Sequence, residues 1–141
     1  MMLNISYERL KHSLEVARLM KGLAADKGWS KQKCEEMFIL GYLHDVGYEF
    51  SEQQCDHANI GGEMLRNQGY KYWKEVSYHG KLEVDYSSEE LDMLNMADMR
   101  IDSKGNDVGV EKRLEDIATR YGKASMQFIE AELLAKKMNL L

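Results

Sequence analysis

Apolar side chains recur at helical spacing along most of the chain. In residues 7–27 they stand three and four positions apart, and Gly28 follows. The two neighbouring stripes are Leu10, Leu14, Ala17 and Ala24, and Val16, Leu19 and Leu23. Side chains with this spacing lie on one face of an α-helix. The pattern therefore predicts a long first helix with a wide buried face.

Further helices are predicted by the same spacing and by cap residues. The sequence has no proline, and most of its eleven glycines stand where a helical pattern stops. Ser30 can cap the second helix, and Ser87 with Glu90 forms a capping box for the fifth. We expect the later helices over about residues 30–47, 56–68, 71–79, 87–101, 110–122 and 124–138.

These elements predict an all-α fold of about six or seven helices. The 141 residues are enough to bury a core, so we expect a single compact domain over residues 1–141. Its core lies in about 1–104, and C-terminal helices occupy about 109–139.

Composition narrows the classes of function. The net charge is −5 and the lysines and arginines are scattered, so we expect no long nucleic acid as a partner. No apolar stretch is long enough for a membrane span and the N-terminus lacks a leader pattern, so we expect a soluble cytoplasmic protein. Cys34 and Cys55 form no CxxC pair and are interpreted as ordinary thiols.

One carboxylate stands where the helical pattern calls for an apolar side chain. Asp98 lies on the stripe of Leu91, Leu94 and Ile101. A buried carboxylate without a partner is costly, so it is expected to shift its pKa, pair with a cation or bind a metal. His12 also points inward, because it shares a face with Val16.

Asp98 and the histidines together supply a set of nitrogen and oxygen ligands. Mixed sets of this kind suit iron, manganese, cobalt, nickel or zinc, and the two oxygens of Asp45 could bridge two such ions. A metal-bound hydroxide is a strong nucleophile near neutral pH. The candidate ligands are His12, His44, Asp45, His57, His79 and Asp98.

At these residues the sequence resembles the HD superfamily of metal-dependent phosphohydrolases. The family pattern is a histidine on the first core helix, then His-Asp, optional histidines and a distal aspartate. The matching segments are Leu-Lys-His-Ser-Leu-Glu-Val-Ala, Gly-Tyr-Leu-His-Asp-Val-Gly-Tyr, Asp-His-Ala-Asn-Ile-Gly-Gly, Ser-Tyr-His-Gly and Met-Ala-Asp-Met-Arg. The resemblance covers about the first hundred residues.

The resemblance implies a ligand set and a substrate class. It implies that the first histidine, the His-Asp pair and the distal aspartate hold one ion, and that His57 and His79 add a second. It is closest to small bacterial HD proteins that resemble diadenosine tetraphosphate hydrolases, which implies a nucleotide or dinucleoside polyphosphate as the small phosphorylated substrate. A single-metal nucleotidase would carry glutamate where this chain has Tyr48.

Roles in catalysis and substrate binding follow as hypotheses. His44 and Asp45 would orient the nucleophile as catalytic residues. Lys81, Arg100 and Lys104 stand near ligands in the sequence and could contact a phosphate, although each is also typical of a solvated surface.

Other functions share the same ligand list. A di-iron oxygenase could use these six residues, and a non-catalytic module could bind a nucleotide or metal and signal through the C-terminal helices. Histidines hydrogen-bonded within a core, without metal, are a further alternative. The C-terminal helices could cover the core or pair two chains as a homodimer.

Overall fold

The computed structural model describes residues 6–49 and 57–141, and these residues confirm the predicted all-α fold. They form seven α-helices and one short 3-10 helix, and their only extended pairing is an isolated bridge between Ile101 and Asp107. The elements are α1 (Tyr7–Asp26), α2 (Lys31–Leu43), η1 (Val46–Glu49), α3 (His57–Asn67), α4 (Trp73–Tyr78), α5 (Glu89–Asp98), α6 (Val110–Tyr121) and α7 (Met126–Lys137).

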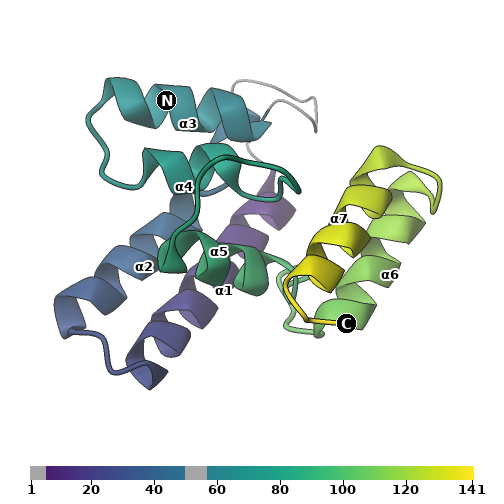
Figure 1. Ribbon diagram of the computed structural model, residues 1–141, viewed down its shortest axis with the longest axis horizontal. Helices are drawn as coiled ribbons and strands as arrows, with labels where there is room; N and C mark the ends of the chain where they lie inside the picture. Colours follow the sequence, from purple (N-terminus) through teal and green to yellow (C-terminus); the bar gives the residue numbers. More distant parts are fainter. Residues whose placement is uncertain (1–5, 50–56) are drawn as a thin grey trace.

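The first five helices share one hydrophobic core (Figure 1). Val16 of the predicted stripes is fully inaccessible in it, as is Met20, which the prediction did not include, and Leu40 of α2 and Leu94 of α5 meet them there. Burial of each such side chain contributes about 1.5–3 kcal/mol. The predicted Leu19 and Leu23 are only partly buried. This core fixes the directions of α1, α2 and α5, which carry four of the candidate ligands.

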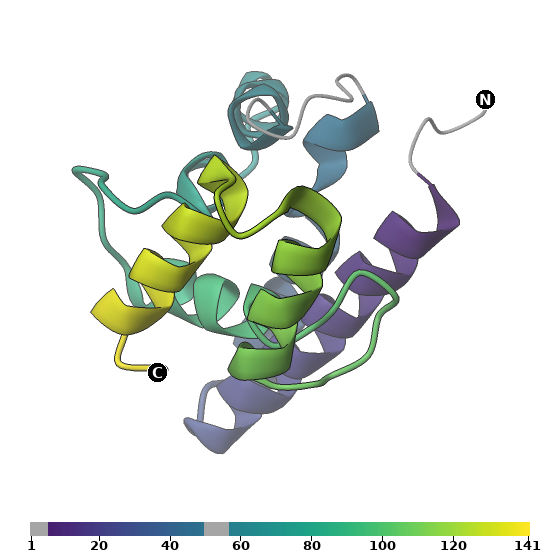
Figure 2. The same ribbon diagram turned by 90° about the vertical axis from the view of Figure 1, so that its right-hand side faces the viewer.

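Helices α6 and α7 form a hairpin, here called the C-terminal hairpin, that stands beside the five-helix body (Figures 1 and 2). The hairpin has a small core of its own, in which Leu114 of α6 and Ala135 of α7 pack against Met99 at the end of α5. Because this contact point lies next to Asp98, the hairpin is anchored beside the candidate ligands.

Two helix starts differ from the prediction. Ser30 caps α2 as expected, accepting a hydrogen bond from the Lys33 amide at 3.1 Å. The predicted capping box of Ser87 and Glu90 is wrong: the cap is Ser88, whose hydroxyl accepts from Leu91 N at 2.9 Å. Glu90 instead pairs with Lys33 at 2.5 Å, since a charged partner on α2 competes for its carboxylate. Helix α4 begins at Trp73 rather than near residue 71.

None of the helices among the described residues combines the length and apolar character that crossing a bilayer requires. Cys34 is a buried free thiol, whereas Cys55 and residues 1–5 lie outside the described part of the chain.

Candidate metal centre

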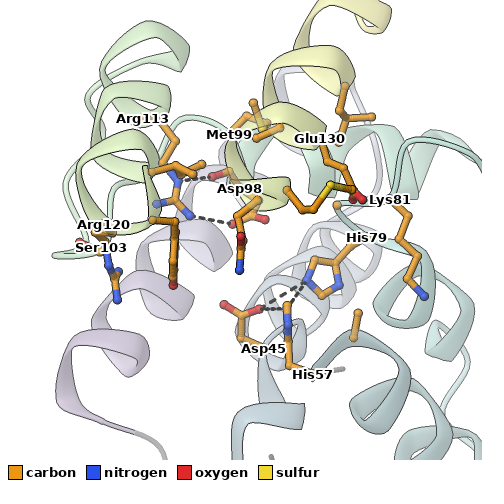
Figure 3. A pocket seen from close by; sticks show the side chains of 18 of the residues that line it. Asp45, His57, His79, Lys81, Asp98, Met99, Ser103, Arg113, Arg120 and Glu130 are labelled. Carbon is orange, nitrogen blue, oxygen red and sulfur yellow. Dashed lines mark hydrogen bonds and ion pairs between the residues drawn. The ribbon is translucent and has the colours of Figure 1, made fainter. Parts of the chain in front are cut away.

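The structure brings all six candidate ligands to one place, here called the histidine–aspartate cluster. Figure 3 shows four of them, Asp45, His57, His79 and Asp98. Its members come from five helices or their ends, so residues up to 86 positions apart in sequence meet there. Two groups have ligand atoms that all lie within 4.8 Å of one another. The groups are His12, His44 and Asp98, and His44, Asp45 and His79.

Helix ends explain how neighbouring residues reach the same point. Inside a helix, adjacent side chains diverge by roughly 100°. Helix α2 ends at Leu43, and His44 is its C-cap with dihedral angles that are still helical, so Asp45 lies beyond the helix; His44 Nε2 lies 3.2 Å from Asp45 Oδ2. His57 begins α3 and Asp98 ends α5.

Backbone carbonyls orient three of the four imidazoles. Nδ1 of His12, His44 and His79 lies 3.0, 2.6 and 2.5 Å from the carbonyl oxygens of residues 102, 41 and 76, respectively. A carbonyl oxygen can only accept, so each Nδ1 donates a proton. A neutral ring with this tautomer would present the lone pair of Nε2 to the cluster, as metal-ligating histidines do when the other ring nitrogen is held by an outer partner.

Asp45 faces the imidazoles with both of its oxygens. Its Oδ1 lies 3.1 Å from His57 Nε2 and 3.4 Å from His79 Nε2. Its Oδ2 lies 3.2 Å from His44 Nε2 and 3.8 Å from His12 Nε2. One carboxylate therefore separates two pairs of histidines.

One buried nitrogen without a hydrogen-bond partner indicates that these residues fit a cation. His44 is fully inaccessible, and in the described part of the chain its Nε2 has no hydrogen-bond partner. Such an atom is costly unless it is paired. His44 Nε2 faces Asp45 and, at 3.5 Å, Asp98 Oδ1, so a cation among them would satisfy all three residues. The donor set fits a divalent metal.

Electrostatics keep the carboxylates charged. Burial alone would raise the pKa of Asp45 and Asp98, but the neighbouring imidazoles, above all His44 for Asp45 and His12 for Asp98, hold both pKa values well below the ordinary value. Burial lowers the pKa of His79, which favours the neutral ring that a metal requires. Ionised carboxylates and a neutral imidazole are the ligand forms that bind divalent cations.

Tyr48 and Arg9 extend the cluster, although the sequence assigned neither to a site. Tyr48 is 5% exposed, and its ring stacks on His57 with centroids 4.2 Å apart. The Arg9 guanidinium lies 3.3 Å from the centre of the same ring. Arg9 precedes His12 by one helical turn on α1, and this spacing is a signal that could have pointed to it.

Arg113 of α6 links the C-terminal hairpin to the cluster. Its Nε donates to the Asp98 carbonyl oxygen at 3.3 Å, and its Nη2 lies 4.0 Å from Asp98 Oδ1. Its Nη1 donates to Asp116 at 2.9 Å, and Asp116 accepts from the Ser103 amide. Sequence reasoning missed Arg113, yet it stands directly before Leu114 on the apolar side of its helix.

A cleft of about 940 Å³ opens beside the cluster. The C-terminal hairpin forms one wall, and the cationic side chains in the lining are those of Arg9, Lys81, Arg113 and Arg120. Of the three proposed phosphate contacts, Lys81 lines the cleft and donates to Asn59. Arg100 instead pairs with Asp107, and Lys104 is exposed. Neither residue lines the cleft.

The protein thus combines an all-α fold with a histidine–aspartate cluster beside a cleft. The family model described as HD domain matches residues 9–136, and the chain therefore belongs to the HD domain family. The match runs through α6 and α7, beyond the hundred residues that carried the sequence resemblance. HD domains bind divalent metals and are mostly hydrolases, which fits metal-dependent phosphohydrolase chemistry in general. Searches of curated proteins and of solved structures gave no match.

Proposed function

We propose that this protein is a phosphohydrolase that uses two divalent transition-metal ions bridged by Asp45. The observation that carries the proposal is the division of the histidines between the two oxygens of Asp45. His12, His44 and Asp98 would hold one ion with Oδ2, and His57 and His79 would hold the other with Oδ1. The mixed nitrogen and oxygen ligands favour iron, manganese, cobalt, nickel or zinc.

The protein's own residues would position the reacting groups. Bound ions would supply an activated water nucleophile and polarise the phosphoryl oxygens. His44 and Asp45, as the buried pair at the centre of the cluster, would orient the nucleophile. Lys81 and Arg113 lie on opposite sides of the cluster, where each adds positive charge for a phosphoryl group (Figure 3).

The substrate class is a phosphoester or phosphoanhydride, and we propose a nucleotide or dinucleoside polyphosphate. The size of the cleft supports a ligand larger than phosphate, since it lies near the upper end of the roughly 300–1,000 Å³ usual for small-molecule sites. Its arginines support an anionic ligand, because a guanidinium binds phosphate with two parallel hydrogen bonds.

Elemental analysis of the protein purified without added metal or chelator tests the proposal. We expect two equivalents of a transition metal in the wild type, whereas His44→Ala and Asp98→Ala should lose the ion that these two residues would hold with Asp45 Oδ2. His57→Ala should retain one, and Lys104→Ala, which alters an exposed residue outside the cleft, should retain two. A wild type that takes up none of the five metals would contradict the proposal.

Activity assays with the loaded protein separate the alternatives. Phosphate release from nucleotides or dinucleoside polyphosphates, abolished in Asp45→Ala, supports the hydrolase. Stoichiometric iron with oxygen uptake and no phosphate release would indicate a di-iron oxygenase. Ligand binding without turnover, unchanged in Asp45→Ala, would indicate a regulatory module.

A further inference from the structure

Helix α7 carries apolar side chains on two sides, although packing against α6 requires only one. The inner stripe contributes to the core of the C-terminal hairpin, and its residues are Phe128, Ala131 and Ala135. The other side, here called the outer stripe, is formed by Met126, Ile129 and Leu133, which are 65, 40 and 43% exposed. At the angular step of a helix, the centres of the two stripes lie roughly 160° apart. A contiguous exposed apolar stripe marks a binding surface.

The outer stripe lines the same cleft as the histidine–aspartate cluster. All three of its residues lie in the lining together with Asp45, His57 and His79, and Leu82 adds a further apolar side chain. The Lys137 ammonium donates to the Leu82 carbonyl oxygen at 2.9 Å, which ties the end of α7 to the loop that carries Leu82. The apolar surface is therefore continuous with the candidate metal centre.

Charges divide the cleft into two sides. Arg113 and Arg120 lie on one side of the cluster, and Lys81 with Glu130 lies on the other, on the side of α7 (Figure 3). Glu8 and Glu83 also line the cleft. Anionic groups of a ligand are thus favoured toward α6, whereas on the side of α7 the charge of Glu130 offsets that of Lys81 and the helix offers apolar surface.

We propose that the outer stripe binds the organic body of the substrate, an aromatic or largely apolar group such as a nucleobase, while its phosphate lies at the cluster and toward the arginines of α6. This inference rests on the proposed function, since both concern one cleft. A second copy of the chain is the weaker occupant. Three part-exposed side chains offer far less than the roughly 800 Å² per partner of a stable interface, and a copy seated there would close the cleft.

Calorimetric titration of the metal-loaded protein tests this inference with two non-hydrolysable ligands. One is the phosphonate analogue of AMP, in which carbon replaces the ester oxygen, and the other is methylphosphonate, which lacks an organic body. The wild type should bind the AMP analogue more tightly. Leu133→Ser should weaken that binding on the order of tenfold, because one aliphatic contact is lost, and should leave methylphosphonate unaffected.

The control is Ile39→Ser, which alters a side chain of α2 that is 49% exposed and does not line the cleft. It should change neither affinity. Equal affinity for both ligands in the wild type, or an unchanged affinity for the AMP analogue in Leu133→Ser, would overturn the inference and leave the proposed function standing. Failure of both ligands to bind would count against the proposed function as well.

Sedimentation of the same proteins tests whether a second copy of the chain covers the outer stripe. Conversion of a wild-type dimer into a monomer by Leu133→Ser would assign the stripe to a subunit interface and overturn the inference. If Leu133→Ser fails to fold, Met126→Ser replaces it, since Met126 is the most exposed member of the stripe.

Discussion

The ring of Tyr48 lies flat against the imidazole of His57, with the two planes 8° from parallel. Arg9 lies over the same ring, and at 3.3 Å it cannot share the face that His57 occupies, so Tyr48 is held between them. The stack fixes the plane of the His57 ring while its Nε2 faces Asp45 at 3.1 Å. Tyr48 is thus an outer partner of a candidate ligand.

Removal of this ring should weaken the second metal site. We expect Tyr48→Ala to lower the affinity for one of the two ions by about 10–100-fold, the usual effect of losing a group that orients a ligand. Tyr48→Phe should retain wild-type affinity, because the stack needs only the ring. Metal titration of the apoprotein measures both, and a loss of equal size in the two variants would show that the hydroxyl matters instead.

Gly47 is required by the close approach of η1 to α3. A Cβ at this position would lie 1.8 Å from the His57 carbonyl oxygen and 2.9 Å from the Gly61 amide nitrogen. Gly47→Ala should therefore displace the start of α3 and lower the free energy of unfolding by about 1–3 kcal/mol. Urea denaturation measures the loss. Gly22→Ala is the control: it meets no atom within 4 Å on α1 and should stabilise the protein by up to ~1 kcal/mol.

Arg113 should contribute more to stability than Arg100. The Arg113 side chain is 15% exposed and contacts Asp98 and Asp116, so Arg113→Ala should lower the free energy of unfolding by about 1–3 kcal/mol. Arg100 pairs with a largely exposed Asp107, and Arg100→Ala should cost less than about 1 kcal/mol. Chemical denaturation of both variants makes the comparison, and equal losses would contradict it.

The hydrogen bond between Tyr72 and Glu36 should make stability depend on pH. The Tyr72 hydroxyl donates to Glu36 at 2.8 Å and lowers the pKa of that carboxyl. Since the folded pKa lies below the unfolded value of about 4.3, the stabilisation is complete above that pH and is lost as pH falls through the folded pKa. Tyr72→Phe should cost about 1 kcal/mol near neutral pH and less at about pH 3. Unfolding curves at both pH values test this, and a constant difference would refute it.

Periodicity predicted the helices because each one buries an apolar face that leaves a regular trace in the sequence. It also predicted that His12 and Asp98 point inward, since both interrupt such a face. The convergence of the six residues did not follow from periodicity, because it depends on how α1, α2 and α5 cross, and it was anticipated only through the family resemblance. Their role as metal ligands remains a prediction.

Contacts that depend on tertiary packing could not be predicted from the sequence. Proximity along the chain suggested Arg100 and Lys104, yet Arg100 turns toward Asp107 because an acidic partner is available there. Arg113 reaches Asp98 from 15 positions away, which only the packing of α6 determines. The cap shifted from Ser87 to Ser88 because adjacent serines are equally suited by type, and Ser88 also donates to Glu75.

The three carbonyl groups that hold the imidazoles of His12, His44 and His79 belong to the main chain. Substitution of a side chain leaves such an acceptor in place as long as the backbone keeps its path. Most substitutions at the residues that provide these carbonyl groups should therefore leave the orientation of the rings unchanged. Apart from Arg113, which contacts Asp98, the residues of α6 and α7 could therefore diverge and recognise new ligands while these rings keep their orientation.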